Sequence, residues 1–217
     1  MELTPTAPPT TPQSLPQARL HLASRSPRRQ ELLTQIGVKF DRIGFRNPPR
    51  DDKELDEMPL AGEDPAAYVQ RVARAKAEHG WRIVNWRSLE PQPVLAADTA
   101  LEFADEIIGK PVDAQDAERI LRRLSGVSHR VLTAVAVGFA GRLESALSIS
   151  EVRFRRLDAD EIRRYVASGE PLDKAGAYGI QGRAGMFVEY LAGSYSGVMG
   201  LPLFETANLL KRFDFPL

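Results

Sequence analysis

The chain has 217 residues, 43% hydrophobic and 27% charged, which is the composition of a folded globular protein rather than of a disordered or collagen-like one. Lysine plus arginine and aspartate plus glutamate both number 29, so the net charge is zero, without the basic excess typical of nucleic-acid-binding proteins. The absence of cysteine excludes disulfides, thiolate nucleophiles and cysteine zinc sites, and the three histidines are too far apart in sequence for a histidine metal site.

The first 18 residues differ in composition from the rest. They are rich in proline and threonine, contain no arginine, and carry Glu2 as their single charge. They lack the basic start and apolar run of a secretory signal and the arginines of a transit peptide. We therefore expect a disordered tail over 1–18 and one domain over 19–217. The longest uncharged run, 131–141, is too short to span a bilayer, so we expect a cytoplasmic protein without membrane association.

From residue 19 onward, predicted strands alternate with predicted helices. The first part begins with a strand over 19–23, a helix from Pro27 that Gly37 closes, a strand over 38–45 and a polar loop over 46–63. A helix from Asp64 to about His79, strands over 93–97 and 100–103 and a helix over 113–124 follow. The last part contains strands over 131–139 and 143–154, a helix over 158–167, a glycine-rich segment over 169–185, a strand over 187–191 and a helix over 202–213. This alternation favours an α/β domain built around a mixed sheet.

The segment from Ser24 to Arg29 is a predicted turn between a strand and a helix. Ser26 suits an N-cap and Pro27 the first helical position, and a helix N-terminus attracts anions through its unpaired N–H groups and its dipole. Arg29 shares its helix face with apolar residues, which suggests that it reaches into a pocket, whereas Arg28 points elsewhere. Taken alone, the segment slightly favours the alternative, an ordinary helix cap with solvated arginines.

Two further charged residues lie among apolar ones. Lys76 is on the apolar face of its predicted helix, which fits either a lysine that extends to water or a cation aimed at a buried anion. Asp98 follows the apolar run 94–97, and a carboxylate there is costly unless it is hydrogen-bonded, metal-bound or catalytic. Strand ends are also where α/β proteins place their sites. An ion pair between Asp98 and Lys110 is the simpler alternative.

A glycine-rich segment and an acidic loop complete the candidates. Gly176, Gly179 and Gly182 recur at a spacing of three, and the pattern matches neither a dinucleotide fingerprint nor a Walker A loop. The segment is therefore either a ligand-binding loop or a tight turn. Asp56 and Glu57 would add ligands if a metal is bound, although acidic loop residues are usually just solvated.

Taken in order, several motifs resemble those of the Maf family of nucleoside triphosphate pyrophosphatases. They are Ser24 to Arg29, Ala97-Asp98-Thr99, Gly109-Lys110-Pro111, the run 169–182, Gly193-Ser194-Tyr195 and Gly200-Leu201-Pro202-Leu203. The resemblance covers 20–213 and leaves out the proline-rich tail. It implies an elongated α/β fold, Maf- and ITPase-like, with a long mixed sheet flanked by helices and a central cleft, often in a homodimer.

The resemblance also implies an activity and a set of roles. The activity is hydrolysis of a nucleoside triphosphate to its monophosphate and pyrophosphate with a divalent cation, magnesium or manganese. Asp98 matches the general base and Lys110 the lysine beside it. The matched substrate-binding positions are Ser24, Arg28, Arg29, Lys76, Thr99, Lys174 and Gln181. Asp98 and Glu57 match the metal ligands, with Glu54 as the alternative to Glu57.

Arg29, Thr99 and Gln181 match positions linked to base choice, and their identities resemble the branch that acts on dTTP and UTP, including modified pyrimidine forms. Such an enzyme would keep modified nucleotides out of nucleic acids. A bound triphosphate carries about four negative charges, so clustered cations are needed before a water held by Asp98 can attack the α-phosphorus. Two alternatives remain: a sister activity on 7-methyl-GTP or non-canonical purine nucleotides, and a non-catalytic module related to septum formation.

Overall fold

The computed structural model describes residues 18–44 and 57–217. The elements in chain order are β1 (Arg19–Leu22), α1 (Pro27–Gln35), β2 (Lys39–Arg42), α2 (Pro65–Trp86), β3 (Val94–Phe103), β4 (Glu106–Ile108), α3 (Ala114–Leu124), β5 (Ser128–Phe139), β6 (Arg142–Phe154), α4 (Ala159–Val166), the 3₁₀ helices η1 (Glu170–Asp173), η2 (Ala175–Ala177) and η3 (Arg183–Phe187), β7 (Val188–Ala192), α5 (Tyr195–Met199) and α6 (Leu203–Arg212). The predicted α/β alternation is confirmed.

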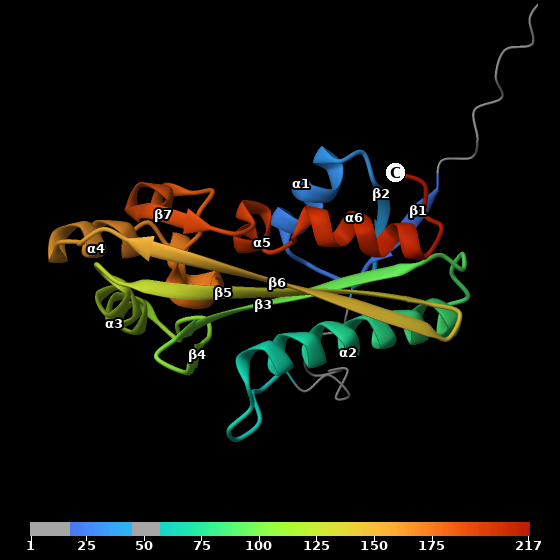
Figure 1. Ribbon diagram of the computed structural model, residues 1–217, viewed down its shortest axis with the longest axis horizontal. Helices are drawn as coiled ribbons and strands as arrows, with labels where there is room; N and C mark the ends of the chain where they lie inside the picture. The colour runs from blue at the N-terminus through green and yellow to red at the C-terminus, as the bar shows by residue number, and fades with distance from the viewer. Residues whose placement is uncertain (1–17, 45–56) are drawn as a thin grey trace, which may run out of the picture.

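The described strands form one mixed sheet of seven strands in the order β2-β1-β3-β5-β6-β7, with β4 paired to β3. β1 runs parallel to both β2 and β3, whereas the pairs β3–β5, β5–β6 and β6–β7 are antiparallel. The three longest strands, β3, β5 and β6, lie along the long axis of the molecule and give it an elongated shape (Figure 1). This confirms the long mixed sheet expected from the sequence.

Helices cover both faces of the sheet (Figure 1). α2 packs on one face through contacts with β3, β5 and β6, and α5 and α6 pack on the other against β5 and β6. Side chains of β3 alternate between the two cores, with Val94, Ala96 and Ala100 on the α2 side and Leu95 and Leu101 on the opposite side. Since successive side chains of a strand point to opposite faces, Asp98 faces α2 and Thr99 faces away from it.

The helix that begins at Asp64 extends further than predicted. Asp64 caps it, with its side chain accepting from the backbone N–H groups of Ala66 and Ala67, but α2 ends at Trp86 rather than near His79. At Gly80, just past the expected end, glycine allows close packing, since a Cβ at this position would lie 2.7 Å from Cγ1 of Val94. The buried contact with β3 outweighs the low helix propensity of glycine.

Three other expectations require correction. The two predicted short strands are one continuous strand, β3, so Asp98 lies in the middle of a strand and not at its end. β4 and α5 were not predicted, because both are too short to show a periodic pattern. The glycine-rich segment over 169–185, for which no helix was predicted, contains η1, η2 and the start of η3.

The position of Asp98 is nevertheless at an open edge. β1 pairs with β3 only at Val94 and Leu95, and β4 begins to pair on the same side only at Leu101. Between these points, no strand of the described chain covers this edge of β3. An opening in the middle of the sheet therefore takes the place of the strand end that the sequence suggested.

Two expectations concern residues that lie wholly or partly outside 18–44 and 57–217. The tail predicted over 1–18 lies there except for Ala18, which packs against the larger core, and Glu54 also lies outside the described residues. Among the helices of the described chain, none combines the length and the apolar character needed to cross a membrane.

Candidate active site

A cleft with a volume of about 660 Å³ lies along the open edge of β3. This volume is within the range usual for small-molecule sites. The candidate residues that line it are Arg28, Arg29, Glu57, Lys76, Asp98, Thr99, Lys110, Lys174 and Gln181. Ser24 does not line the cleft, whereas its neighbour Ser26 does. Segments far apart in the sequence therefore converge on one cavity, as the resemblance implied.

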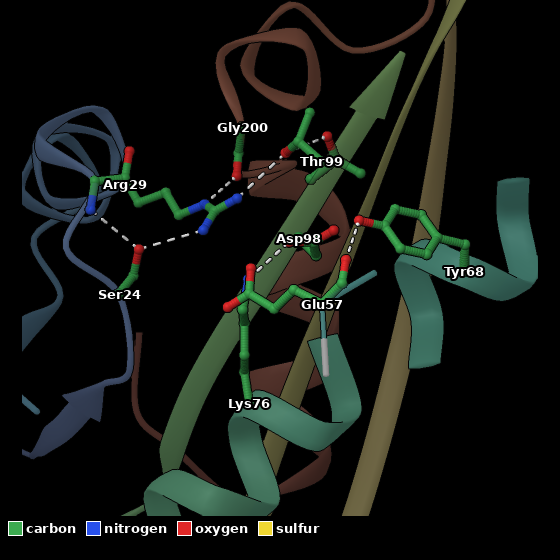
Figure 2. A network of polar contacts seen from close by, with 10 residues as sticks. Ser24, Arg29, Glu57, Tyr68, Lys76, Asp98, Thr99 and Gly200 are labelled. Atoms are coloured by element: carbon green, nitrogen blue, oxygen red, sulfur yellow. Dashed lines mark hydrogen bonds and ion pairs between the residues drawn. The ribbon is translucent and has the colours of Figure 1, made fainter. Parts of the chain in front are cut away.

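Lys76 is the centre of the acidic side of the cleft (Figure 2). Its Nζ lies 2.8 Å from Oδ1 of Asp98 and 2.8 Å from Oε2 of Glu57. The Lys76 and Asp98 side chains are only 11% and 12% exposed, while that of Glu57 is 54% exposed. Lys76 is thus aimed at a buried anion, and the partner of Asp98 is Lys76 rather than Lys110. Removing Lys76 would be strongly destabilising, because it leaves Asp98 as an uncompensated buried charge.

Tyr68 lies on α2 and reaches across to the same cluster (Figure 2). Its hydroxyl donates to the backbone carbonyl of Glu57 at 2.9 Å. Burial, together with the negative charges of Asp98 and Glu57, raises the pKa of Tyr68 to about 12. The hydroxyl therefore remains a hydrogen-bond donor at neutral pH.

Arg29 lies at the opposite side of the cleft, where it joins four parts of the chain (Figure 2). Its guanidinium donates to the carbonyl of Gly200 at 2.8 Å, to Oγ of Ser24 at 3.2 Å and to Oγ1 of Thr99 at 3.3 Å. Burial lowers the pKa of this guanidinium, against the raising effect of Asp98, but arginine starts so high that it stays charged. The predicted position of Arg29 in a pocket is confirmed.

A chain of hydroxyl groups continues from Arg29 into the sheet. Thr99 and Thr133 lie opposite each other on β3 and β5, with 3.0 Å between their Oγ1 atoms. Thr133 donates its proton to the carbonyl of Gly197 at 2.8 Å, so Thr99 must donate to Thr133 and accept from Arg29. Each hydroxyl has one proton, which fixes the direction of the whole chain. The sheet thereby orients the guanidinium.

The remaining cations come from two loops and the first turn of α1. Arg28 lies 3.4 Å from a carboxylate oxygen of Asp173, and Lys174 donates to Asp173 and to the carbonyl of Glu170. Lys110 lines the cleft, is exposed, and pairs with no acidic side chain among 18–44 and 57–217. These cations give one wall of the cleft a positive character that suits a polyanion.

The glycine-rich segment is part of the cleft wall, which favours the ligand-loop interpretation over a mere tight turn. Gly176 has a φ of +71°, and a Cβ there would lie 2.3 Å from Cδ1 of Leu101. Its N–H donates to the carbonyl of Gly109 at 3.0 Å, which ties this segment to the loop that carries Lys110. Glycine is required here because the backbone is left-handed and lies directly against β3.

Asp98 and Glu57 are the side chains that would hold a divalent cation. Each directs an oxygen at the Lys76 ammonium, so the two carboxylates lie close enough together to share one positive charge. The described residues contain no cluster of three or more potential metal-ligating side chains. Magnesium commonly binds through one or two carboxylates and completes its shell with water and substrate phosphates. The donor set therefore fits such a cation.

The sequence analysis missed Tyr68 and the apolar part of the cleft wall. Tyr68 is eight residues before Lys76, on the same side of α2, so helical spacing from Lys76 was the available signal. The apolar part of the wall comes from β3, β4, β5 and α5, and its members read in sequence as ordinary core residues. They are Leu101, Ile107, Ile108, Val131, Val198 and Met199.

Comparisons with known proteins show the family of this chain. The dTTP/UTP pyrophosphatase of Dechloromonas aromatica is 66% identical over 91% of this chain and 98% of its own length. The proteins of the same name from Aromatoleum aromaticum and Chromobacterium violaceum are 62% and 53% identical, over 93% and 92% of this chain and 98% and 96% of their own lengths. The solved structure of the Staphylococcus aureus Ham1 protein aligns with a TM-score of 0.45 and 15% identity, over 90% of this chain and 97% of that one. The family model described as Maf-like protein matches residues 19–213, and the chain belongs to the Maf family.

Proposed function

We propose that this chain is a dTTP/UTP pyrophosphatase, which hydrolyses these nucleotides to the monophosphate and pyrophosphate. The observation that carries the proposal is near full-length similarity to relatives that bear this name. The cleft supports it chemically, because a buried carboxylate lies in the same cavity as five cationic side chains. They are Arg28, Arg29, Lys76, Lys110 and Lys174.

In the proposed reaction, a water molecule attacks the α-phosphorus in line with the leaving group. Asp98 accepts the proton of this water, and the new bond joins the water oxygen to the α-phosphorus. The bond from the α-phosphorus to the bridging oxygen breaks, and its electron pair leaves with pyrophosphate. Lys76 holds the Asp98 carboxylate through a 2.8 Å contact, so this base is oriented before substrate arrives.

The cations have a different role, which is to bind and orient the triphosphate. Arg29 is fixed by three hydrogen bonds, and such pre-organised donors stabilise developing charge without reorganisation. Lys110 and Lys174 would neutralise the phosphates that become the leaving group. Asp98 and Glu57 would hold a magnesium or manganese ion, which would supply positive charge to offset that of the departing pyrophosphate.

Base choice is assigned in this proposal to Arg29, Thr99 and Gln181. The Gln181 amide offers both a donor and an acceptor, which complements the edge of uracil or thymine. Gln181→Glu removes the donor and should change the preference among nucleotides. An unchanged preference would exclude this role for Gln181.

The decisive experiment is a pyrophosphate-release assay with dTTP, UTP, CTP, ATP, GTP and 7-methyl-GTP, each with Mg²⁺ or Mn²⁺. We expect turnover of dTTP and UTP. Preferred turnover of a purine nucleotide would support the sister activity instead, and no turnover of any nucleotide would support a binding module.

The role of Asp98 is tested by Asp98→Asn, which keeps the shape of the side chain but removes the base. We expect kcat to fall by roughly 10²- to 10⁴-fold with little change in KM. Asp105→Asn is the matched control, since Asp105 is an exposed carboxylate outside the cleft. Wild-type turnover by Asp98→Asn would exclude Asp98 as the base.

A further inference from the structure

The segment 57–63, which we call the strap, carries Glu57 to the cleft. It contains no helix or strand, and its large apolar side chains are exposed, Met58 by 72% and Leu60 by 56%. A segment that buries so little apolar surface is not held in place by hydrophobic packing. Its position must therefore come from polar contacts.

Those contacts come mainly from Arg71 on α2. Its Nε and Nη2 lie 2.6 Å and 2.7 Å from the two carboxylate oxygens of Glu63, a bidentate pair, and Nη2 also donates to the carbonyl of Met58 at 3.0 Å. One guanidinium thus binds both ends of the strap. The hydrogen bonds from Arg71 lower the pKa of Glu63 to about 2, so the pair stays ionised at neutral pH.

Glu63 also closes the strap on itself. Its carboxylate accepts from the backbone N–H of Leu60 at 3.0 Å, and its own N–H donates to the carbonyl of Leu60 at 3.0 Å. Next to it, the Arg71 guanidinium lies 5.7 Å from the centre of the Tyr68 ring, whose hydroxyl binds the carbonyl of Glu57. The strap is therefore bound to α2 at both of its ends, and hydrogen bonds within the strap close its turn.

Arg71 does not line the cleft, whereas Glu57 does. The Glu57 side chain is 54% exposed, so little besides its backbone and the Lys76 ammonium restricts it. A free carboxylate on an unrestrained segment loses conformational entropy when it binds a cation, and a fixed one loses less. Groups that orient a metal ligand without touching the metal are known to change metal affinity strongly.

We propose that Arg71, paired with Glu63, is a positioning residue that sets the divalent-cation affinity of the site by holding Glu57 at the cleft. This rests on the proposed function, in which Glu57 is a ligand. α2 then contributes Arg71 to restrain the strap as well as Lys76 to hold the Glu57 carboxylate. Arg71 itself contacts neither substrate nor cation.

The first test measures hydrolysis of dTTP at varied Mg²⁺ for Arg71→Gln, Glu63→Gln and the double variant. We expect the apparent Mg²⁺ activation constant to rise by roughly 10- to 100-fold in each single variant. The double variant should shift no further, because both changes break the same pair. At saturating Mg²⁺, kcat and the KM for dTTP should stay close to wild type. Arg71→Lys, which keeps the charge but not the bidentate fork, should lie in between.

Arg74→Gln is the matched control, because it makes the same substitution one turn further along α2. Arg74 is exposed and donates to Oγ of Ser145, so its loss should leave the Mg²⁺ dependence unchanged. If Arg71→Gln changes kcat, KM and the Mg²⁺ constant in parallel, its role is general stability and the proposal is wrong. An unchanged Mg²⁺ constant overturns it as well.

The second test needs neither activity nor metal. Hydrogen–deuterium exchange on the metal-free full chain should show faster exchange over 58–63 in Arg71→Gln than in wild type or Arg74→Gln. Unchanged exchange would show that Arg71 does not hold the strap. If the wild type hydrolyses no nucleotide, the proposed function fails, while this measurement still decides whether Arg71 restrains the segment.

Discussion

The Lys76 ammonium bridges two carboxylates, so replacing it should affect stability more than replacing either acid. Lys76→Met removes the charge and keeps much of the side-chain volume. It leaves Asp98 as a buried carboxylate next to that of Glu57. In the wild type, Oδ1 of Asp98 and Oε2 of Glu57 both contact Nζ of Lys76. Asp98→Asn is milder, because Lys76 then keeps Glu57 as its partner.

The size of the effect follows from burial and distance. At 2.8 Å and an effective dielectric constant of about 20, the attraction between Lys76 and Asp98 is roughly 6 kcal/mol before desolvation is subtracted. Breaking one partner of a buried pair typically costs about 3–5 kcal/mol. For a chain of this size, that lowers Tm by roughly 6–20 °C. We expect Lys76→Met to fall in this range and Asp98→Asn to fall well below it.

The assay is thermal and urea unfolding of wild type, both single variants and Lys76→Met with Asp98→Asn. The double variant should recover most of the stability that Lys76→Met loses, because it no longer buries an unpaired charge. The reasoning is refuted if Lys76→Met is as stable as Asp98→Asn, or if the double variant is no better than Lys76→Met.

Three further outcomes are expected. Burial lowers the pKa of His129 to about 4, so on acidification the unfolded state takes up a proton before the folded state does. The free energy of unfolding should therefore fall by about 3 kcal/mol between pH 6.5 and pH 4. Urea titrations of His129→Gln should lack this part of the pH dependence. Gly176→Ala should lower Tm more than Gly169→Ala, because both positions have positive φ but only at Gly176 does the added Cβ meet Leu101; equal losses in calorimetry would contradict this. Arg29→Lys keeps the charge but cannot reach three acceptors, so the KM for dTTP should rise about tenfold in steady-state assays, and an unchanged KM would exclude Arg29 as a substrate ligand.

Local sequence determined the helix beginnings and the chemistry available to the site. Asp64, Asp113 and Asp158 were expected at the starts of helices, and each caps its helix through its own side chain. Such caps depend on residues two or three positions apart, so a linear reading finds them. The apolar run before Asp98 and the arginines after Pro27 likewise marked the charged residues that line the cleft.

Tertiary structure alone decided which of these residues meet. Lys76 and Asp98 are 22 positions apart, and Arg29 and Gly200 are 171 apart, distances over which no helical or strand periodicity applies. The same holds for the end of α2, which extends past Gly80 to Trp86 as the helix packs closely on Val94. It holds most clearly for Asp98, whose access to the cleft depends on β1 leaving the edge of β3 before β4 joins it. Sequence patterns encode local geometry, whereas an opening within a sheet is set by where separate strands stop pairing.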